Sequence, residues 1–255
     1  MRIIGGEFKR RRLHTPKDAS TTRPMPDLVR QAVFNLLRGH FEGEAVLDAF
    51  SGTGAIGLEA VSRGAARVVL IEKNRHIAKL VEKNIEELGC ADRAELVVGD
   101  ALGPAALMRC PDPVHIIFLD PPYPLVRDPD GWERFVRQFE RLIAKLDDTG
   151  YAVLRTPWPF FHEAPAPPPE PEVDESVVYD LDRDGPLDAE GIEALANEPD
   201  NDAPVQEHDE PPPKTPVDLN FSFAVGPETH IYGKSAVHLY MKRPPGDRGT
   251  EERDE

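Results

Sequence analysis

The sequence predicts a doubly wound α/β fold from three observations. From residue 44 onward, short continuous apolar runs alternate with segments of helical periodicity. The runs are rich in leucine and β-branched residues, which is typical of strands buried on both faces of a parallel sheet. A glycine-rich turn follows the first run, at the place where sheets of this class bind ligands. The order of elements is therefore that of a β-α-β protein.

The first predicted element is an amphipathic helix over 27–37, with Pro26 and Asp27 suited to its N-terminus. Apolar runs then predict strands at 45–47, 68–71, 96–98, 115–119 and 151–154. Apolar residues at three- and four-residue spacing predict helices over 77–88, closed by Gly89, and over 132–146. Two strands around Gly233, within 230–241, are expected to close the sheet as an antiparallel pair.

The net charge of −16 is concentrated in one segment. Residues 161–218 contain 18 Asp and Glu against 2 Lys and Arg, together with 12 of the 27 prolines. This composition buries too little apolar surface to offset the entropy of ordering, so the segment is predicted to be disordered or extended, with a short strand at 177–179. The first 43 residues instead carry 9 Lys and Arg against 4 Asp and Glu. The body of the protein is thus mildly basic.

Several classes of protein are excluded by composition. Two cysteines, Cys90 and Cys110, cannot form a disulfide framework, which favours a reducing cytoplasm. The first residues do not resemble a signal peptide, and no run approaches the length of a membrane span. The eight histidines show no metal-ligand spacing, so no metal is expected. A monomer is expected, because no exposed apolar stripe requires a partner.

Glycines at 52, 54 and 57 form a tight turn between the first strand and the next helix. Without a Cβ, such a turn lets the backbone approach a nucleoside closely. The spacing also matches a dinucleotide fingerprint, so the turn alone leaves both NAD and S-adenosylmethionine open.

Acidic residues after three successive strands narrow this choice. Glu72 ends the second strand and is suited to ribose hydroxyls of either ligand. Asp48, four residues before the first glycine, favours a ligand with an ammonium and a sulfonium group. Asp100, after the third strand, is suited to an adenine amine. The combination favours S-adenosylmethionine as the cofactor.

The fourth strand ends in Asp120, Pro121, Pro122 and Tyr123. The two prolines make a rigid loop, whose carbonyls are expected to point into the cleft. An Asp carboxylate and a proline carbonyl offer two acceptors to one amino group and hold its nitrogen in line with a methyl donor. Tyr123 offers a face on which a flipped base can stack. The motif therefore predicts methylation of a planar exocyclic amine.

Residues along much of the chain resemble one known family. The N-terminal part of the likeness comprises Arg2-Ile3-Ile4, Gly6, Arg11-Arg12-Leu13, Thr22-Arg23-Pro24, Asp27, Val29-Arg30, Ala32, Phe34-Asn35 and Leu37. It continues through Leu47-Asp48, Phe50, Gly52-Thr53-Gly54, Gly57-Leu58-Glu59-Ala60, Ser62-Arg63-Gly64-Ala65, Glu72-Lys73, Asn84, Asp100-Ala101, Phe118 to Tyr123 and Tyr232-Gly233. Over about 185 residues the chain is similar to the bacterial small-subunit rRNA guanine-N2 methyltransferases.

This resemblance implies a class I methyltransferase (Rossmann-like) sheet of seven strands in the order 3-2-1-4-5-7-6. It also implies S-adenosylmethionine as donor and a guanine N2 in 16S rRNA, within the small subunit or its assembly intermediate, as acceptor. The cofactor-binding residues carried over are Asp48, Phe50, Gly52, Thr53, Gly54, Glu72, Lys73, Asp100 and Ala101. The catalytic residues carried over are Asp120, Pro121, Pro122 and Tyr123. The RNA-binding residues carried over are Arg2, Lys9, Arg10, Arg11, Arg12, Arg23 and Arg30.

The predicted organisation has four parts. Residues 1–43 form a basic hairpin and helix, 44–160 with 219–243 the methyltransferase domain, 161–218 an acidic Pro-rich disordered insertion, and 244–255 a disordered tail. Two features depart from the family. The family has glycine where this chain has Arg10, which would strain the hairpin if a positive φ is required there. The acidic insertion is foreign to compact members, and three roles are open: competition with RNA, a lower non-specific binding, or an inert spacer.

Two other functions are open at this point. The Asp-Pro-Pro-Tyr motif suits any planar amine, so an adenine-N6 DNA methyltransferase or a protein glutamine methyltransferase is the first alternative. No separate DNA-recognition domain is visible, which weakens the DNA version. The second alternative is a non-catalytic ribosome assembly factor, and the intact glycine turn and catalytic loop disfavour it.

Overall fold

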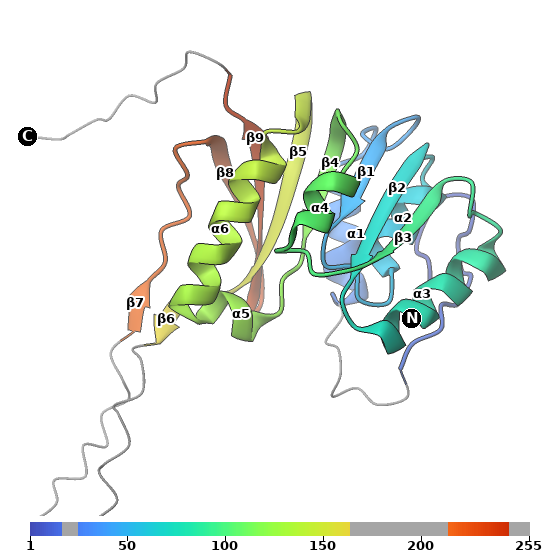
Figure 1. Ribbon diagram of the computed structural model, residues 1–255, viewed down its shortest axis with the longest axis horizontal. Coiled ribbons are helices and arrows are strands. Elements are labelled where there is room, and N and C mark those ends of the chain that lie inside the picture. Colours follow the sequence, from blue (N-terminus) through green and yellow to red (C-terminus); the bar gives the residue numbers. More distant parts are fainter. Residues whose placement is uncertain (17–24, 164–213, 245–255) are drawn as a thin grey trace, which may run out of the picture. The chain divides into compact units, whose positions relative to one another are not determined.

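The computed structural model describes residues 1–16, 25–163 and 214–244, which are built around a seven-stranded sheet (Figure 1). Its strands are β1 (Ala45–Asp48), β2 (Arg67–Glu72), β3 (Ala94–Val98), β4 (Val114–Leu119), β5 (Leu146–Pro157), β8 (Ala224–Tyr232) and β9 (Ser235–Lys242). They lie in the order β3-β2-β1-β4-β5-β9-β8. The first five are parallel, and β9 pairs antiparallel with both β5 and β8. Counted within this sheet the order is 3-2-1-4-5-7-6, so the predicted topology is confirmed.

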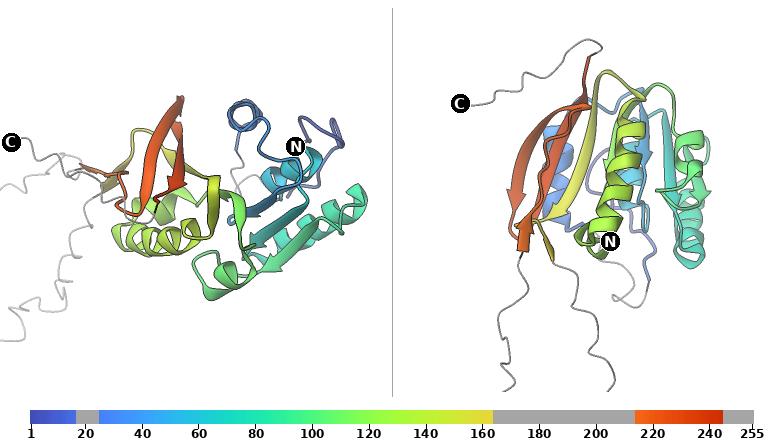
Figure 2. Two further views of the ribbon diagram at one scale, coloured as in Figure 1. Left: turned by 90° about the horizontal axis from the view of Figure 1, so that it is seen from above. Right: turned by 60° about the vertical axis from the view of Figure 1, so that its left-hand side comes forward.

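Helices cover both faces of the sheet (Figure 2). They are α1 (Asp27–Leu36), α2 (Ala55–Ser62), α3 (Arg75–Leu88), α4 (Pro104–Arg109), α5 (Tyr123–Arg127) and α6 (Pro129–Ile143). Alternate residues of a strand pack against the helices on opposite faces of the sheet. Ile116 and Phe118 of β4 pack with α1, α2 and α3, whereas Ile117 and Leu119 pack with α4, α5 and α6. Burial on both faces explains why the strands read as continuous apolar runs.

The predicted C-terminal end is correct for α3, which begins two residues earlier than predicted, and wrong for α6. Asn74 caps α3 by accepting hydrogen bonds from His76 and Ile77, and Gly89 ends the helix with a φ of 67°. Helix α6 ends at Ile143, and Leu146, predicted as helical, is the first residue of β5. Leu146 packs in the same core cluster as α6, and its apolar character fits either element. Periodicity alone therefore could not locate this boundary.

The N-terminal residues form a hairpin that is anchored on α2. Arg2 pairs with Arg12 in an antiparallel bridge. The carboxylate of Glu59, which is fully buried, accepts hydrogen bonds from the backbone N–H groups of Ile4 (2.6 Å) and Gly5 (2.8 Å). The hairpin also places apolar side chains in the core on the α1–α3 side of the sheet. Its position is thus fixed by both burial and charge-assisted hydrogen bonds.

Two short strands lie at the ends of the predicted insertion. Strands β6 (Phe161–Glu163) and β7 (Lys214–Pro216) form a separate two-stranded sheet. The chain divides into one compact unit of Met1–His162 with Pro216–Glu255 and a second of Glu163–Thr215. Periodicity does not reveal strands of three residues. The short strand predicted at 177–179 lies outside the described residues, as does the tail after residue 244.

Within the described ranges, no helix has both the length and the apolar character of a membrane span.

Candidate active site

The predicted cofactor residues gather at one edge of the sheet. Because β1, β2, β3 and β4 are parallel neighbours, their carboxyl ends meet at that edge. Asp48 ends β1, Glu72 ends β2, and Asp100 follows β3 by two residues. Asp120 follows directly on β4. The structure thus brings four carboxylates from distant parts of the sequence to the ends of adjacent strands, where open α/β sheets bind ligands.

The glycine turn after β1 requires its glycines for two different reasons. Gly54, at the N-terminus of α2, has a φ of 79°, a conformation that side chains with a Cβ adopt rarely. Gly57 instead allows close packing: a Cβ there would lie 2.7 Å from Cδ2 of Leu70 and 3.2 Å from Oδ2 of Asp48. Helix α2 therefore sits directly against β2 and the Asp48 carboxylate.

Asp48 is fully buried and has one unsatisfied oxygen. Its Oδ2 accepts a hydrogen bond from the backbone N–H of Gly57 over 2.8 Å, whereas Oδ1 is buried without a partner among the described residues. Burial raises the pKa of Asp48 to about 7, and the nearby charges of Asp120 and Glu72 add to the rise, against the opposing Gly57 bond. A buried carboxylate in this state is suited to a cationic group brought by a ligand.

Glu72 and Asp100 border the same edge and are less buried. Burial raises the pKa of Glu72, while backbone hydrogen bonds from Asn74, Gly52 and Lys73 oppose the rise. The Glu72 carboxylate therefore contacts the glycine turn itself. Asp100 accepts a hydrogen bond from the backbone of Leu102 over 2.9 Å and lies 3.5 Å from Nζ of Lys73. The predicted cofactor residue Lys73 is thus an ion-pair partner of Asp100.

The remaining predicted cofactor residues have structural partners as well. Phe50 lies 6.3 Å from Phe135 of α6, measured between ring centroids. Thr53 is buried, and its carbonyl accepts a hydrogen bond from the side chain of Asn84 over 3.2 Å. Ala101 is buried next to Asp100. These contacts connect the residues at this edge to α3 and α6.

Asp120 is held by Arg155, a residue that the motif analysis missed. Nε of Arg155, on β5, donates a hydrogen bond to Oδ1 of Asp120 over 2.6 Å, and the two side chains are 9% and 12% exposed. Oδ2 of Asp120 has no hydrogen-bond partner in the part of the chain that the structure describes. Burial raises the pKa of Asp120, and the charge and hydrogen bond of Arg155 oppose the rise. An arginine within an apolar strand is rare, and this rarity is the feature of the sequence that could have indicated a role for Arg155.

The two proline carbonyls of the Asp-Pro-Pro-Tyr loop, both expected to face the cleft, differ in their hydrogen bonds. The Pro122 carbonyl accepts hydrogen bonds from the N–H groups of Leu125 (3.0 Å) and Val126 (3.4 Å), because it begins α5. The Pro121 carbonyl has no such partner among the described residues. The carbonyl of Pro121, which is buried, and Asp120 Oδ2 are therefore two acceptors without a hydrogen-bond donor in the described part of the chain.

Tyr123 is half-buried between cationic groups. The guanidinium carbon of Arg155 lies 5.4 Å from the ring centroid, and that of Arg127 lies 5.9 Å from it. The Tyr123 hydroxyl donates a long hydrogen bond of 3.4 Å to the carbonyl of Thr156. Arg155 thus contacts both ends of the Asp-Pro-Pro-Tyr loop, and the stacking role predicted for Tyr123 stays a prediction.

The residues predicted to bind RNA differ in exposure: those of the hairpin are on the surface, whereas Arg30 of α1 is buried. Arg2, Lys9, Arg11 and Arg12 are exposed. The phosphate contact predicted for Arg30 is not supported, because its side chain is 1% exposed. Arg30 donates hydrogen bonds to the Arg2 carbonyl (2.7 Å) and to Asp27 (2.9 Å), and burial lowers its pKa. It therefore joins α1 to the hairpin.

Arg10 has a φ of 72°, and within the described residues it alone among non-glycine residues has a positive φ. The expected strain at this departure from the family is therefore present. The side chain is exposed, so the strained backbone presents a cation to solvent. Arg23, also predicted to contact RNA, lies outside the described residues.

Histidines that are distant in the sequence meet at the opposite edge of the sheet. Nδ1 of His115 lies 2.7 Å from Oδ2 of Asp147, and its Nε2 lies 3.0 Å from Nδ1 of His40. Glu44 lies near this cluster. Both ring nitrogens of His115 have partners within the protein, so we interpret the cluster as a hydrogen-bond chain rather than a metal centre.

The sheet order, the glycine turn after β1 and the acidic residues after β1, β2 and β3 define the Rossmann-like fold of the class I methyltransferases. The chain belongs to the family described as "Conserved hypothetical protein 95", whose model matches residues 1–140.

Relatives of known name agree with this assignment. The chain is 40% identical over 123 residues to "Ribosomal RNA small subunit methyltransferase D" of Escherichia coli (strain K12), covering 48% of this chain and 60% of that protein. It is 32% identical over 124 residues to the protein of the same name from Haemophilus influenzae, covering 48% and 64%. The chain thus spans about 60% of the length of these relatives. The predicted family resemblance is confirmed.

A solved structure supports the fold. The protein named "Putative methyltransferase yhhF from Escherichia coli" superposes with a TM-score of 0.59 at 24% identity, covering 95% of this chain and 98% of that one.

Proposed function

We propose that the protein transfers a methyl group from S-adenosylmethionine to the exocyclic N2 of a guanine in 16S rRNA of the small ribosomal subunit. The observation that carries the proposal is the pair of acceptors after β4. Asp120 Oδ2 and the Pro121 carbonyl have no partners among the described residues, at the edge where Asp48 and Glu72 lie. The names of the relatives support rRNA as the acceptor.

The residues at the edge fit this donor. S-Adenosylmethionine carries a sulfonium and an ammonium group, and it supplies an electrophilic methyl group when bound. Asp48 has a buried oxygen without a partner in the described region, which a cation or a donor N–H would satisfy. Gly52 has open space where a Cβ would stand, so a ligand can approach its backbone. We assign the ribose hydroxyls to Glu72 and the adenine amine to Asp100.

The two acceptors orient an amine. The lone pair of a guanine amino group is delocalised into the ring, so the amine is a weak nucleophile. Hydrogen bonds from its two N–H groups to Asp120 Oδ2 and to the Pro121 carbonyl favour a pyramidal nitrogen and hold it in line with the methyl group. Arg155 keeps the Asp120 carboxylate in one orientation for this purpose. The proton that leaves the methylated nitrogen passes to Asp120 or to water.

The exposed cations of the hairpin support an RNA substrate. Arg2, Lys9, Arg10, Arg11 and Arg12 are exposed on one short segment, and each phosphate that they neutralise adds to a salt-dependent affinity. We further propose that the protein acts in the cytoplasm as a monomer on the subunit or its assembly intermediate. Residues 1–43 are proposed as the RNA-binding part, 44–160 with 219–243 as the catalytic part and 161–218 as an acidic insertion.

Transfer of a labelled methyl group tests this function. The acceptors are small ribosomal subunits from cells that lack the protein, naked rRNA and duplex DNA, with Asp120→Ala as the control variant. Label in subunit RNA that is lost in Asp120→Ala supports the proposal. Label in DNA alone would move the assignment to adenine methylation. Subunit binding with no label in any acceptor, although the donor binds, would favour a non-catalytic assembly factor.

A further inference from the structure

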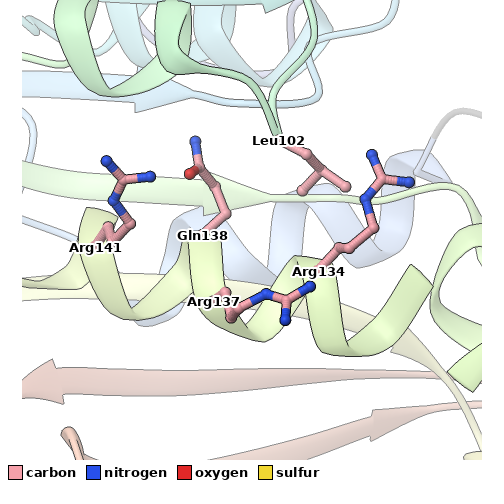
Figure 3. Close-up of a pocket in the computed structure, with 5 residues that line it drawn as sticks. All are labelled: Leu102, Arg134, Arg137, Gln138 and Arg141. Carbon is pink, nitrogen blue, oxygen red and sulfur yellow. The ribbon is translucent and has the colours of Figure 1, made fainter. Parts of the chain in front are cut away.

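Three arginines of α6 line a pocket that has no part in the site described above (Figure 3). The pocket has a volume of about 250 Å³ and is lined by Leu102, Arg134, Arg137, Gln138 and Arg141. We name it the α6 groove. No carboxylate lines it, so its charge is strongly positive.

The helix itself explains why these cations share a surface. The apolar residues of α6, such as Phe135, Phe139 and Leu142, are buried against the sheet. Arg134, Arg137 and Arg141 follow at spacings of three and four residues, which places them on one exposed stripe. A stripe of basic residues is more often a solvated face than a binding site, so further observations are needed to distinguish the two.

The first such observation is the absence of ion-pair partners. Nη1 of Arg137 donates a hydrogen bond to Glu133 over 2.7 Å. Arg134 and Arg141 form no ion pair with any residue in 1–16, 25–163 or 214–244. Two other exposed arginines, Arg67 and Arg109, both lie against Glu95. Two guanidinium groups therefore line the α6 groove without a carboxylate partner among the residues that the structure describes.

The second observation is a rigid connection to the candidate active site. Gln138 is 5% exposed, and its Nε2 donates hydrogen bonds to the carbonyls of Ala101 (2.9 Å) and Gly103 (3.1 Å). Its side chain points toward the loop that carries Leu102 (Figure 3). Gln138 thus fixes the middle of α6 to the loop after β3, next to Asp100. A ligand in the α6 groove lies beside that loop.

We infer that the α6 groove binds a phosphate of the RNA whose base is methylated, with Arg134 and Arg141 as the contacting residues. Guanidinium groups match phosphate oxygens through paired N–H donors. The hairpin presents its cations on the α1–α3 side of the sheet, whereas α6 lies on the other face. The inference rests on the proposed function, to which it adds a second anchor for the same RNA on the opposite face.

Binding of a labelled single-stranded RNA, measured by fluorescence anisotropy across a salt series, tests this inference. The variant is Arg134→Gln/Arg141→Gln, and the charge-matched control is Arg67→Gln/Arg109→Gln. Loss of the contact to this one phosphate should flatten the slope of log K against log salt concentration by about 0.7. The control should keep the wild-type slope. Equal donor affinity in all proteins shows that the site itself is intact.

Two results would overturn the inference. The first is a wild-type slope in the α6 variant, and the second is an equal loss in the control, which would reveal a general charge effect. Methyl transfer by the wild-type protein, measured separately, distinguishes the two proposals. A wild-type protein that binds RNA through the α6 groove but transfers no methyl group would contradict the proposed function and leave this inference standing.

Discussion

Arg155 donates a hydrogen bond from Nε to Oδ1 of Asp120 over 2.6 Å, and the two side chains are 9% and 12% exposed. The bond joins β5 to the loop after β4. Because it uses one carboxylate oxygen, it fixes the direction of the other. The same guanidinium lies 5.4 Å from the ring centroid of Tyr123, so a single side chain positions both ends of the loop.

Replacing Arg155 should therefore impair turnover more than donor binding. A displacement of about 1 Å can cost roughly 100-fold in rate, so we expect kcat of Arg155→Gln to fall by about that factor. Loss of the cation also raises the pKa of Asp120 further, so the activity of the variant should recover as pH rises. Arg155→Lys should restore part of kcat. Arg127→Gln is the control, since Arg127 contacts Tyr123 but not Asp120. A wild-type pH profile for Arg155→Gln would contradict this role.

Donor affinity should depend on the ionisation of Asp48. Burial raises the pKa of this carboxyl to about 7, and a cationic donor favours its charged form. Affinity should therefore rise about tenfold between pH 6 and pH 8, with uptake of the donor releasing a proton. The stability of the donor-free protein depends on pH in the opposite direction. Asp48 binds its proton more tightly in the folded state than in the unfolded chain, so the free energy of unfolding falls as pH rises from about 4 to about 7. Calorimetric titration of wild type and Asp48→Asn checks the first effect, which Asp48→Asn should lack. If the donor affinity of Asp48→Asn rose as steeply with pH as that of wild type, a group other than Asp48 would cause the pH dependence.

The strands could be predicted because burial on both faces leaves a direct signature in the sequence. The carboxyl ends of those strands then located Asp48, Glu72, Asp100 and Asp120 without further information. The boundaries between helices and strands were harder to predict from the sequence. Leu146 is buried whether it belongs to a helix or a strand, so its apolar character could not decide between α6 and β5.

Contacts between distant residues explain the other differences. Arg30 was grouped with exposed cations, yet it lies three and four residues before Val33 and Phe34 on the buried face of α1. Its Nη2 donates hydrogen bonds to Asp27, one turn earlier on α1, and to the carbonyl of Arg2, which the hairpin brings there from a distant part of the sequence. Arg155 is separated from Asp120 by 35 residues. The order of the strands in the sheet places the two side chains together, and no pattern of neighbouring residues in the sequence indicates such a pair.

The positive φ of Arg10 predicts a stabilising substitution. A non-glycine residue in this conformation costs roughly 1 kcal/mol or more. Arg10→Gly should therefore be more stable than Arg10→Ala by about 1 kcal/mol, since both remove the charge and only alanine keeps a Cβ. Urea unfolding of the two variants provides the comparison. Equal unfolding midpoints would show that the hairpin relaxes without cost.

His238 should make the fold sensitive to acid. Its ring lies between the hydroxyls of Thr156 (2.9 Å) and Thr229 (2.8 Å), and burial lowers its pKa from 6.5 to about 4. The unfolded chain then binds a proton that the folded protein does not, so the contribution of His238 to stability is full above pH 6.5 and is lost as pH falls toward 4. Between pH 7 and pH 5 this contribution falls by about 2 kcal/mol, while the raised pKa of Asp48 acts in the opposite direction. Chemical denaturation at both pH values should therefore show that wild type loses about 2 kcal/mol relative to His238→Gln over this interval. The same pH dependence in both would assign it to other groups.

The identity of the methylated nucleoside tests the central proposal most directly. Subunit RNA labelled by the wild-type protein is digested to nucleosides, and the labelled product is separated and weighed by mass spectrometry. We predict a single labelled product, N2-methylguanosine, which is absent when Asp120→Ala replaces the wild type. Label in N6-methyladenosine, on a ring nitrogen or on a ribose would contradict the assignment of Asp120 and Pro121 to a guanine amine.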